Sequence, residues 1–188
     1  MEAELKKILA QRNKHYITDK DRLPSAVLIP LYQEDGQYHI IFIKRTMTVK
    51  THQGQISFPG GMQDRVDKTL RDTALRESEE EIGLRREDVN ILGELDDEIT
   101  TTSNYIVTPF VATIPWPYRF KPNKNEVAKI IGVPIAALME KDCRKPETET
   151  LNGKKVESFA YYYQGTRIWG ATARILNKLL EIIAGLPR

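Results

Sequence analysis

Apolar residues recur along this chain in short runs bounded by glycine, proline and polar residues, a pattern typical of β-strands. The runs predict strands at 25–32, 38–44, 89–95, 105–114, 126–133, 156–163 and 167–169. The tripeptide Glu34-Asp35-Gly36 is typical of a turn and is expected to join the first two strands. The last two strands are expected to pair as a hairpin.

Other stretches carry apolar residues three or four positions apart, which is the period of an α-helix. They predict helices at 1–16, 134–140 and 171–184. The inward-facing residues are expected to be Leu5, Ile8 and Leu9 in the first helix, and Ile175, Leu176, Leu179, Ile182 and Ile183 in the last. Pro134 suits the first turn of the middle helix. Strands that alternate with helices in this way favour an α/β sandwich.

A further helix is expected within residues 58–84, after a turn at Pro59-Gly60-Gly61. Because glycine has no Cβ, Gly61 lets the backbone approach a ligand closely, so it is a candidate substrate-binding residue. Asp67 is expected to cap the start of this helix, and Gly83 to end it in the left-handed conformation. The buried side of the helix would consist of Leu70, Ala74, Leu75 and Ile82.

Three glutamates gather on one side of this helix. At 100° per residue, Glu77, Glu80 and Glu81 fall within an arc of about 100°, whereas Glu79 points to the opposite side. Each pair of like charges four residues apart costs about 0.2–0.5 kcal/mol, and a divalent cation would offset that repulsion. Mg²⁺ suits these oxygen ligands best. An acidic run is also typical of a solvated helix face, but the glycine turn and the capped helix favour a metal site.

The same segment resembles the signature of the Nudix hydrolases, the Nudix box, which runs Gly, five residues, Glu, seven residues, then Arg-Glu-aliphatic-x-Glu-Glu-x-Gly-aliphatic. Gly61 opens the box in this chain, and the run from Arg76 to Leu84 closes it. The chain departs from the pattern in three places: Asp67 replaces the Glu, eight residues separate Asp67 from Arg76, and Ser78 replaces the aliphatic residue.

The resemblance implies a Nudix-type α/β/α sandwich with a mixed sheet, and a pyrophosphohydrolase that uses Mg²⁺ or Mn²⁺. Its metal ligands and catalytic residues would be Glu77, Glu80 and Glu81. Metal held there would lower the pKa of an attacking water and bind the phosphate oxygens. In relatives the arginine of the box mainly pairs with a helix carboxylate, so Arg76 is expected to be structural.

A second motif lies upstream of the box and is similar to one that marks the coenzyme A pyrophosphatase branch. It consists of Ile41-Phe42-Ile43-Lys44-Arg45-Thr46, Lys50, Gly54 and Phe58-Pro59-Gly60-Gly61. The branch also shares the Asp and the eight-residue spacer of this box, and the likeness covers about residues 24–184. It implies Arg45 and Lys50 as substrate-binding residues. Lys50 stands where the branch has arginine, so it keeps the charge but loses the planar fork.

The implied reaction is cleavage of coenzyme A or acyl-coenzyme A to 3′,5′-ADP and (acyl-)4′-phosphopantetheine. One alternative is a Nudix hydrolase of another nucleoside diphosphate derivative, such as ADP-ribose, a dinucleotide or an oxidised nucleotide. Another is a non-catalytic nucleotide-binding Nudix module, against which the three box carboxylates argue. Glu126 is either a distal base or a hydrogen-bonded structural acid. Arg45, Lys50 and His52 are also explained as exposed residues of a strand end and a turn.

Length and charge narrow the classes of function. The 188 residues suit one domain, expected to span 1–188, with a helical extension at 1–22 and the box region at 58–84. A net charge of +2 gives no electrostatic argument for binding nucleic acid. No apolar run is long enough to span a membrane, and the lone Cys143 fits a reducing compartment, so the cytoplasm is expected. The expected partner is a small nucleotide substrate, and nothing in the sequence indicates an oligomeric state.

Overall fold

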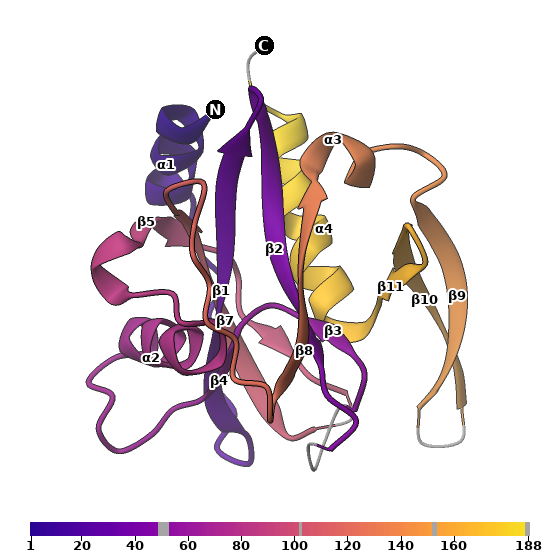
Figure 1. Cartoon of the computed structure of the whole chain (residues 1–188). Coiled ribbons are helices and arrows are strands. Elements are labelled where there is room, and N and C mark those ends of the chain that lie inside the picture. Colours follow the sequence, from indigo (N-terminus) through magenta and orange to yellow (C-terminus); the bar gives the residue numbers. More distant parts are fainter. Residues whose placement is uncertain (49–52, 102, 152–153, 187–188) are drawn as a thin grey trace.

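A computed structural model of the chain describes residues 1–48, 53–101, 103–151 and 154–186 (Figure 1). Its main sheet contains β1 (Leu23–Glu34), β2 (Gln37–Arg45), β3 (Ile56–Ser57), β4 (Gly60–Met62), β5 (Asn90–Glu94), β6 (Glu98–Ile99), β7 (Tyr105–Thr113) and β8 (Val127–Pro134). The strand order is β3-β2-β1-β7-β5, with β4 beside β1, β6 beside β7 and β8 beside β2. Only β1 and β7 pair in parallel among these strands, so the sheet is mixed, as expected.

Two local features set the register of the central strands. Asp35 and Gly36 have φ values of 49° and 78°, so they form the two-residue hairpin loop that joins β1 to β2. The parallel pairing of β1 with β7 runs from Leu23 opposite Tyr105 to Leu31 opposite Thr113. The first residues of β1 and β7 therefore lie at the same end of these two strands, and β4 pairs with β1 at that end.

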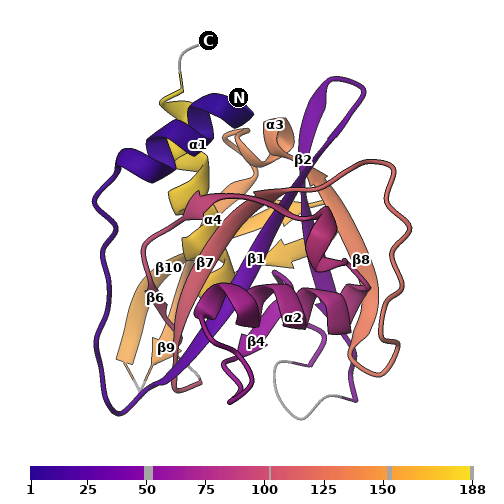
Figure 2. The same ribbon diagram turned by 90° about the vertical axis from the view of Figure 1, so that its left-hand side faces the viewer.

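Helices cover both faces of the sheet (Figures 1 and 2). They are α1 (Glu2–Gln11), α2 (Leu70–Ile82), α3 (Ile135–Leu138) and α4 (Gly170–Ala184), with a 3₁₀ turn at Arg86–Asp88. Side chains alternate across β1, so Leu28 packs with the α2 side and Ile29 with the α1 and α4 side. Each of these two residues is fully buried in its own apolar cluster. The expected α/β/α sandwich with a mixed sheet is thereby confirmed.

A smaller sheet consists of β9 (Arg144–Leu151), β10 (Lys154–Tyr163) and β11 (Thr166–Ile168). The expected hairpin is confirmed, because Tyr161 of β10 pairs with Ile168 of β11. Strand β9 was not predicted, since its residues are mostly polar and include Pro146. An edge strand tolerates proline because its outward N–H needs no partner in the sheet.

The N-terminal helix is shorter than expected, ending at Gln11 instead of Tyr16. The backbone turns to an extended conformation at Arg12, and carboxylates then hold the following segment: His15 N–H donates to Asp96 at 2.8 Å and Ile17 N–H donates to Asp97 at 3.0 Å. These bonds occupy N–H groups that a longer helix would have used internally. In the part of the chain that the structure describes, no helix is long and apolar enough to cross a membrane.

Candidate active site

Helix α2 begins at a cap that the sequence reasoning placed two residues too early. The N-cap is Thr69, whose hydroxyl accepts from the N–H of Asp72 at 3.2 Å, while the Asp72 carboxylate accepts from the N–H of Thr69 at 3.1 Å. This reciprocal arrangement is a capping box. Asp67 therefore does not cap the helix, and that expectation was wrong. The expected end is confirmed, because Gly83 has a φ of 69° and its N–H donates to Glu79 O at 2.9 Å.

Asp67 instead anchors the arginine of the box. Arg76 grips it with two hydrogen bonds, Nε to Oδ1 at 3.0 Å and Nη2 to Oδ2 at 2.9 Å. The hydrogen bonds from Arg76 hold the pKa of Asp67 at about 2, and those from Asp64 N–H and the Thr73 hydroxyl act in the same direction. Arg76 also donates to Met62 O at 3.1 Å, so it ties the loop before α2 to the strand β4.

The three expected metal ligands lie in different surroundings. Glu77 and Glu81 line a pocket, whereas Glu80 is outside its lining, contacts the lining residue Arg76, and has a side chain that is 58% exposed. Arg76 Nη1 donates to Glu77 at 2.9 Å and to Glu80 at 3.1 Å. These contacts offset the repulsion among the glutamates, whereas the sequence analysis expected a divalent cation to do so. Glu79 is exposed, as its position on the helical wheel predicts.

Glu81 is the most deeply buried of these carboxylates, with 2% of its side chain exposed. It accepts from the N–H of Gly60 at 3.0 Å and from Arg45 Nη1 at 3.0 Å. Burial nevertheless raises the pKa of Glu81 to about 7, and the charges of Glu77 and Glu126 act in the same direction. Burial is also the main cause that raises the pKa of Glu77. The site thus concentrates negative charge that lacks full compensation.

The two glycines of β4 serve this charge cluster in different ways. A Cβ at Gly60 would lie 2.3 Å from the carbonyl oxygen of Ala26, and its φ of 151° is disfavoured for other residues, so the tight pairing with β1 requires glycine. A Cβ at Gly61 would lie 2.5 Å from the carboxyl carbon of Glu77. The expected close approach at Gly61 is therefore made by Glu77.

We expect Gly61→Ala to reduce activity far more than stability. The methyl group would displace the end of the flexible Glu77 side chain and leave the backbone in place, so the free energy of unfolding should change by about 1 kcal/mol or less. The kcat per folded molecule should fall on the order of tenfold or more, since misplacing a catalytic group is costly. Chemical denaturation and steady-state kinetics on the same preparation check both values. A large loss of stability with unchanged kcat would reduce Gly61 to a turn residue.

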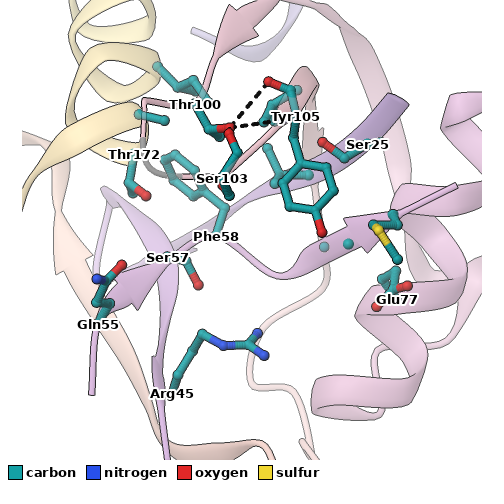
Figure 3. Close-up of a pocket in the computed structure, with 18 of the residues that line it drawn as sticks. Ser25, Arg45, Gln55, Ser57, Phe58, Glu77, Thr100, Ser103, Tyr105 and Thr172 are labelled. Carbon is teal, nitrogen blue, oxygen red and sulfur yellow. Dashed lines mark hydrogen bonds between the residues drawn. The ribbon is translucent and has the colours of Figure 1, made fainter. Parts of the chain in front are cut away.

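The pocket has a volume of about 410 Å³ and brings together distant parts of the chain (Figure 3). Arg45 enters it from the end of β2, where the pairing with β8 shifts register. Its Nη1 binds Glu81, and its Nε is buried without a hydrogen-bond partner. Arg45 therefore has donor capacity left for a ligand. Lys50, the other expected substrate-binding residue, and His52 lie outside the described residues.

Further residues line the same pocket, and among them Glu126 was already a candidate from the sequence. Glu126, just before β8, faces Glu77 and Glu81 and accepts from Asn123 Nδ2 at 3.1 Å. The wall opposite α2 is formed by Thr100, Thr101, Ser103, Tyr105, Trp169, Gly170, Ala171 and Thr172. They come from the loop before β7 and the start of α4. No spacing rule links these segments, because only the packing of α4 against the sheet brings them to the box.

The NUDIX domain model matches residues 22–152, well over half of the chain. The chain belongs to the Nudix family. Two bacterial relatives, each named uncharacterized Nudix hydrolase NudL, support the assignment. The protein from Photorhabdus laumondii is 33% identical over 175 residues, which is 93% of this chain and 88% of the relative. The protein from Pectobacterium atrosepticum is 31% identical over 163 residues, which is 87% of this chain and 84% of the relative.

Solved Nudix structures share the fold. A MutT/nudix family protein from Enterococcus faecalis superposes with a TM-score of 0.61 at 13% identity, covering 98% of this chain and 74% of that protein. The Nudix hydrolase RenU from M. smegmatis gives a TM-score of 0.56 at 18% identity, covering 89% of each chain. The protein is thus a Nudix pyrophosphohydrolase, an enzyme that acts on small nucleotide-derived substrates.

Nudix hydrolases use divalent metal ions, and the donor chemistry of this Nudix site fits one. The expected ligands Glu77, Glu80 and Glu81 offer carboxylate oxygens, which are the hard donors that such ions prefer. Burial raises the pKa values of Glu77 and Glu81, which disfavours their ionised forms, and a cation bound beside them would favour those forms again. Within the described ranges no three such side chains already converge as ligands. Binding would therefore require side-chain rearrangement that brings these carboxylates together.

Proposed function

We propose that this Nudix enzyme hydrolyses the diphosphate of coenzyme A or acyl-coenzyme A, giving 3′,5′-ADP and (acyl-)4′-phosphopantetheine. The observation that carries the proposal is the contact between Arg45 and Glu81 at 3.0 Å, inside one pocket. It joins the motif that resembles the coenzyme A branch to a carboxylate of the Nudix box. The substrate-recognition residue and the hydrolytic residues therefore face the same cavity.

In this proposal Glu77 and Glu81 hold Mg²⁺ or Mn²⁺, with Glu80 contributing directly or through water from outside the pocket lining. When bound, such an ion neutralises phosphate charge and lowers the pKa of a coordinated water. The N–H of Gly60 fixes the orientation of Glu81, and Arg76 fixes Glu77. Arg45 binds a phosphate oxygen through the N–H groups that Glu81 leaves free. Glu126 lines the same pocket and would act as the base toward a water.

The substrate is tested by comparing kcat/KM for coenzyme A, dephospho-coenzyme A and ADP-ribose. Dephospho-coenzyme A lacks the 3′-phosphate of coenzyme A. ADP-ribose lacks both the 3′-phosphate and the pantetheine arm. We expect coenzyme A to be cleaved best. Arg45→Ala and Lys50→Ala should each shrink its advantage by about 1.5–3 kcal/mol, the range of a charged hydrogen bond.

The alternative in the same enzyme class is hydrolysis of ADP-ribose or another nucleoside diphosphate derivative. It would be favoured if the wild-type enzyme cleaved ADP-ribose best, and in that case the coenzyme A proposal fails while the Nudix chemistry stands. A complete lack of hydrolysis across all three substrates, with Mg²⁺ or Mn²⁺ supplied, would favour a binding module. Product masses identify which phosphoanhydride bond is cleaved.

A further inference from the structure

We propose that the end of the pocket beside the start of α4 is a subsite for an uncharged, amide-bearing arm attached to the diphosphate of the substrate. This inference rests on the proposed function and deepens it, because it assigns the pantetheine half of the substrate to residues outside both sequence motifs. Thr172 of α4, Tyr105 of β7 and Ser103 before it would be the determinants of that subsite.

The charged and the neutral lining residues lie at different ends of the pocket. Its charged lining residues, among those the structure describes, are Arg45, Asp64, Arg76, Glu77, Glu81 and Glu126. Ion pairs within the lining join Arg45 to Glu81 and Arg76 to Glu77, so charge concentrates on the side of the box. Figure 3 shows Thr172 and Ser103 on the side away from Glu77, with Tyr105 projecting between. The described lining residues on that side are neutral.

The size of the cavity indicates that more than a diphosphate enters it. A volume of about 410 Å³ falls in the range of roughly 300–1,000 Å³ that accommodates ligands of drug size. Part of the substrate beyond the phosphates must then occupy the neutral end. A second charged group placed there would lose its hydration without gaining a charged partner among the described lining residues, which is unfavourable. An uncharged arm suffers no such loss.

Hydrogen-bonding groups at the neutral end are available for amides. Ser103 Oγ is buried without a hydrogen-bond partner. The Tyr105 hydroxyl makes no hydrogen bond to any residue that the structure describes, although the Tyr105 backbone is held by Thr100, whose N–H donates to Tyr105 O at 3.1 Å. These two hydroxyls have no partner among the described residues, so they can pair with the carbonyl and N–H groups of an arm. Phe58 and Ile175, each 2% exposed, are apolar members of the pocket lining.

The test compares two substrates that share one nucleotide. The first is coenzyme A, and the second is 3′-phosphoadenosine 5′-diphosphate esterified with methanol, which lacks the arm. Thr172→Phe places a ring in the neutral end. We expect the ratio of the KM for coenzyme A to the KM for the methyl ester to rise on the order of tenfold or more, because misfit in an apolar pocket has this magnitude. Tyr105→Phe should raise the same ratio severalfold by removing one hydrogen bond.

A matched control is Thr148→Phe, at an exposed position on β9 that does not line the pocket, and it should leave the ratio unchanged. Circular dichroism and thermal unfolding verify that each variant is folded, and Tyr105→Phe, which only deletes an oxygen, decides the matter if Thr172→Phe fails to fold. If the wild type cleaves both substrates but neither variant changes the ratio, the subsite is wrong while the proposed function stands. If the wild type cleaves neither substrate, the proposed function itself fails.

Discussion

Replacing Glu81 by Gln should lower kcat by a factor on the order of 10² to 10³ with little loss of fold. The substitution keeps the size of the side chain, and the amide oxygen can still accept from the N–H of Gly60. It removes the negative charge that faces Arg45 and that would hold a metal ion. Loss of one such preorganised electrostatic contact costs about this much in rate. Steady-state kinetics at saturating Mg²⁺, together with thermal unfolding, would measure both effects.

The matched control is Glu79→Gln, which makes the same chemical change two residues earlier on the exposed side of α2. It should leave kcat within about twofold of the wild type, because surface charges of this kind contribute little. Glu80→Gln should fall between the two, since Glu80 is outside the pocket lining but contacts the lining residue Arg76. Equal losses at Glu79 and Glu81 would contradict the assignment of the catalytic face.

Replacing Arg76 by Met should produce the largest loss of stability at a site residue. Methionine retains much of the length and apolar character of the arginine side chain, but it leaves Asp67, whose side chain is 3% exposed, without its cation. Breaking a buried ion pair from one side costs about 3–5 kcal/mol. The midpoint of denaturation by urea should fall accordingly. Arg86→Met is the control, because the 54% exposed Arg86 lies 3.4 Å from Asp72 and should change stability by less than about 1 kcal/mol.

The stability of the wild type and that of the Arg76→Met variant should depend differently on pH. The folded-state pKa of Asp67, about 2, lies below the value of about 3.9 expected in the unfolded chain. Its contribution to stability is therefore complete above about pH 5 and is lost progressively as the pH falls through the folded-state pKa of about 2. The difference in unfolding free energy between the wild type and Arg76→Met should shrink over that interval. A difference that stays constant with pH would show that the loss comes from packing alone.

Periodic patterns predicted most of the fold, because each strand or helix must present an apolar face to the core. The strand at 105–114 and the helix at 171–184 differ from β7 and α4 by only one residue at an end. Prediction failed where polar contacts over long sequence distances decide the outcome. The first helix stops early because Asp96 and Asp97 bind the backbone after it, and β9 forms because β10 supplies a partner for a polar segment.

In the candidate site, too, features set by local spacing were predicted and features set by contacts over long sequence distances were not. Local spacing placed Glu77 and Glu81 on the face that lines the pocket and identified Gly83 as the end of the helix. Local spacing could not reveal that Asp67 binds Arg76, since the choice between Asp67 and Thr69 as the cap depends on the loop that joins them to β4. The part of the pocket wall that the start of α4 forms could not be predicted either, because α4 lies more than 80 residues after the box.

Helices α1 and α4, near the two ends of the chain, pack into one apolar core with the main sheet. The NUDIX domain model matches residues 22–152, yet Leu5 of α1 and Leu176 of α4 are fully buried in the cluster that contains Phe42 of β2. A chain shortened to the family-matched segment would leave this face of the sheet bare and would remove the start of α4 from the pocket. The segment matched by the domain model is thus smaller than the structural unit, because helices at both ends of the chain complete the core of the sheet.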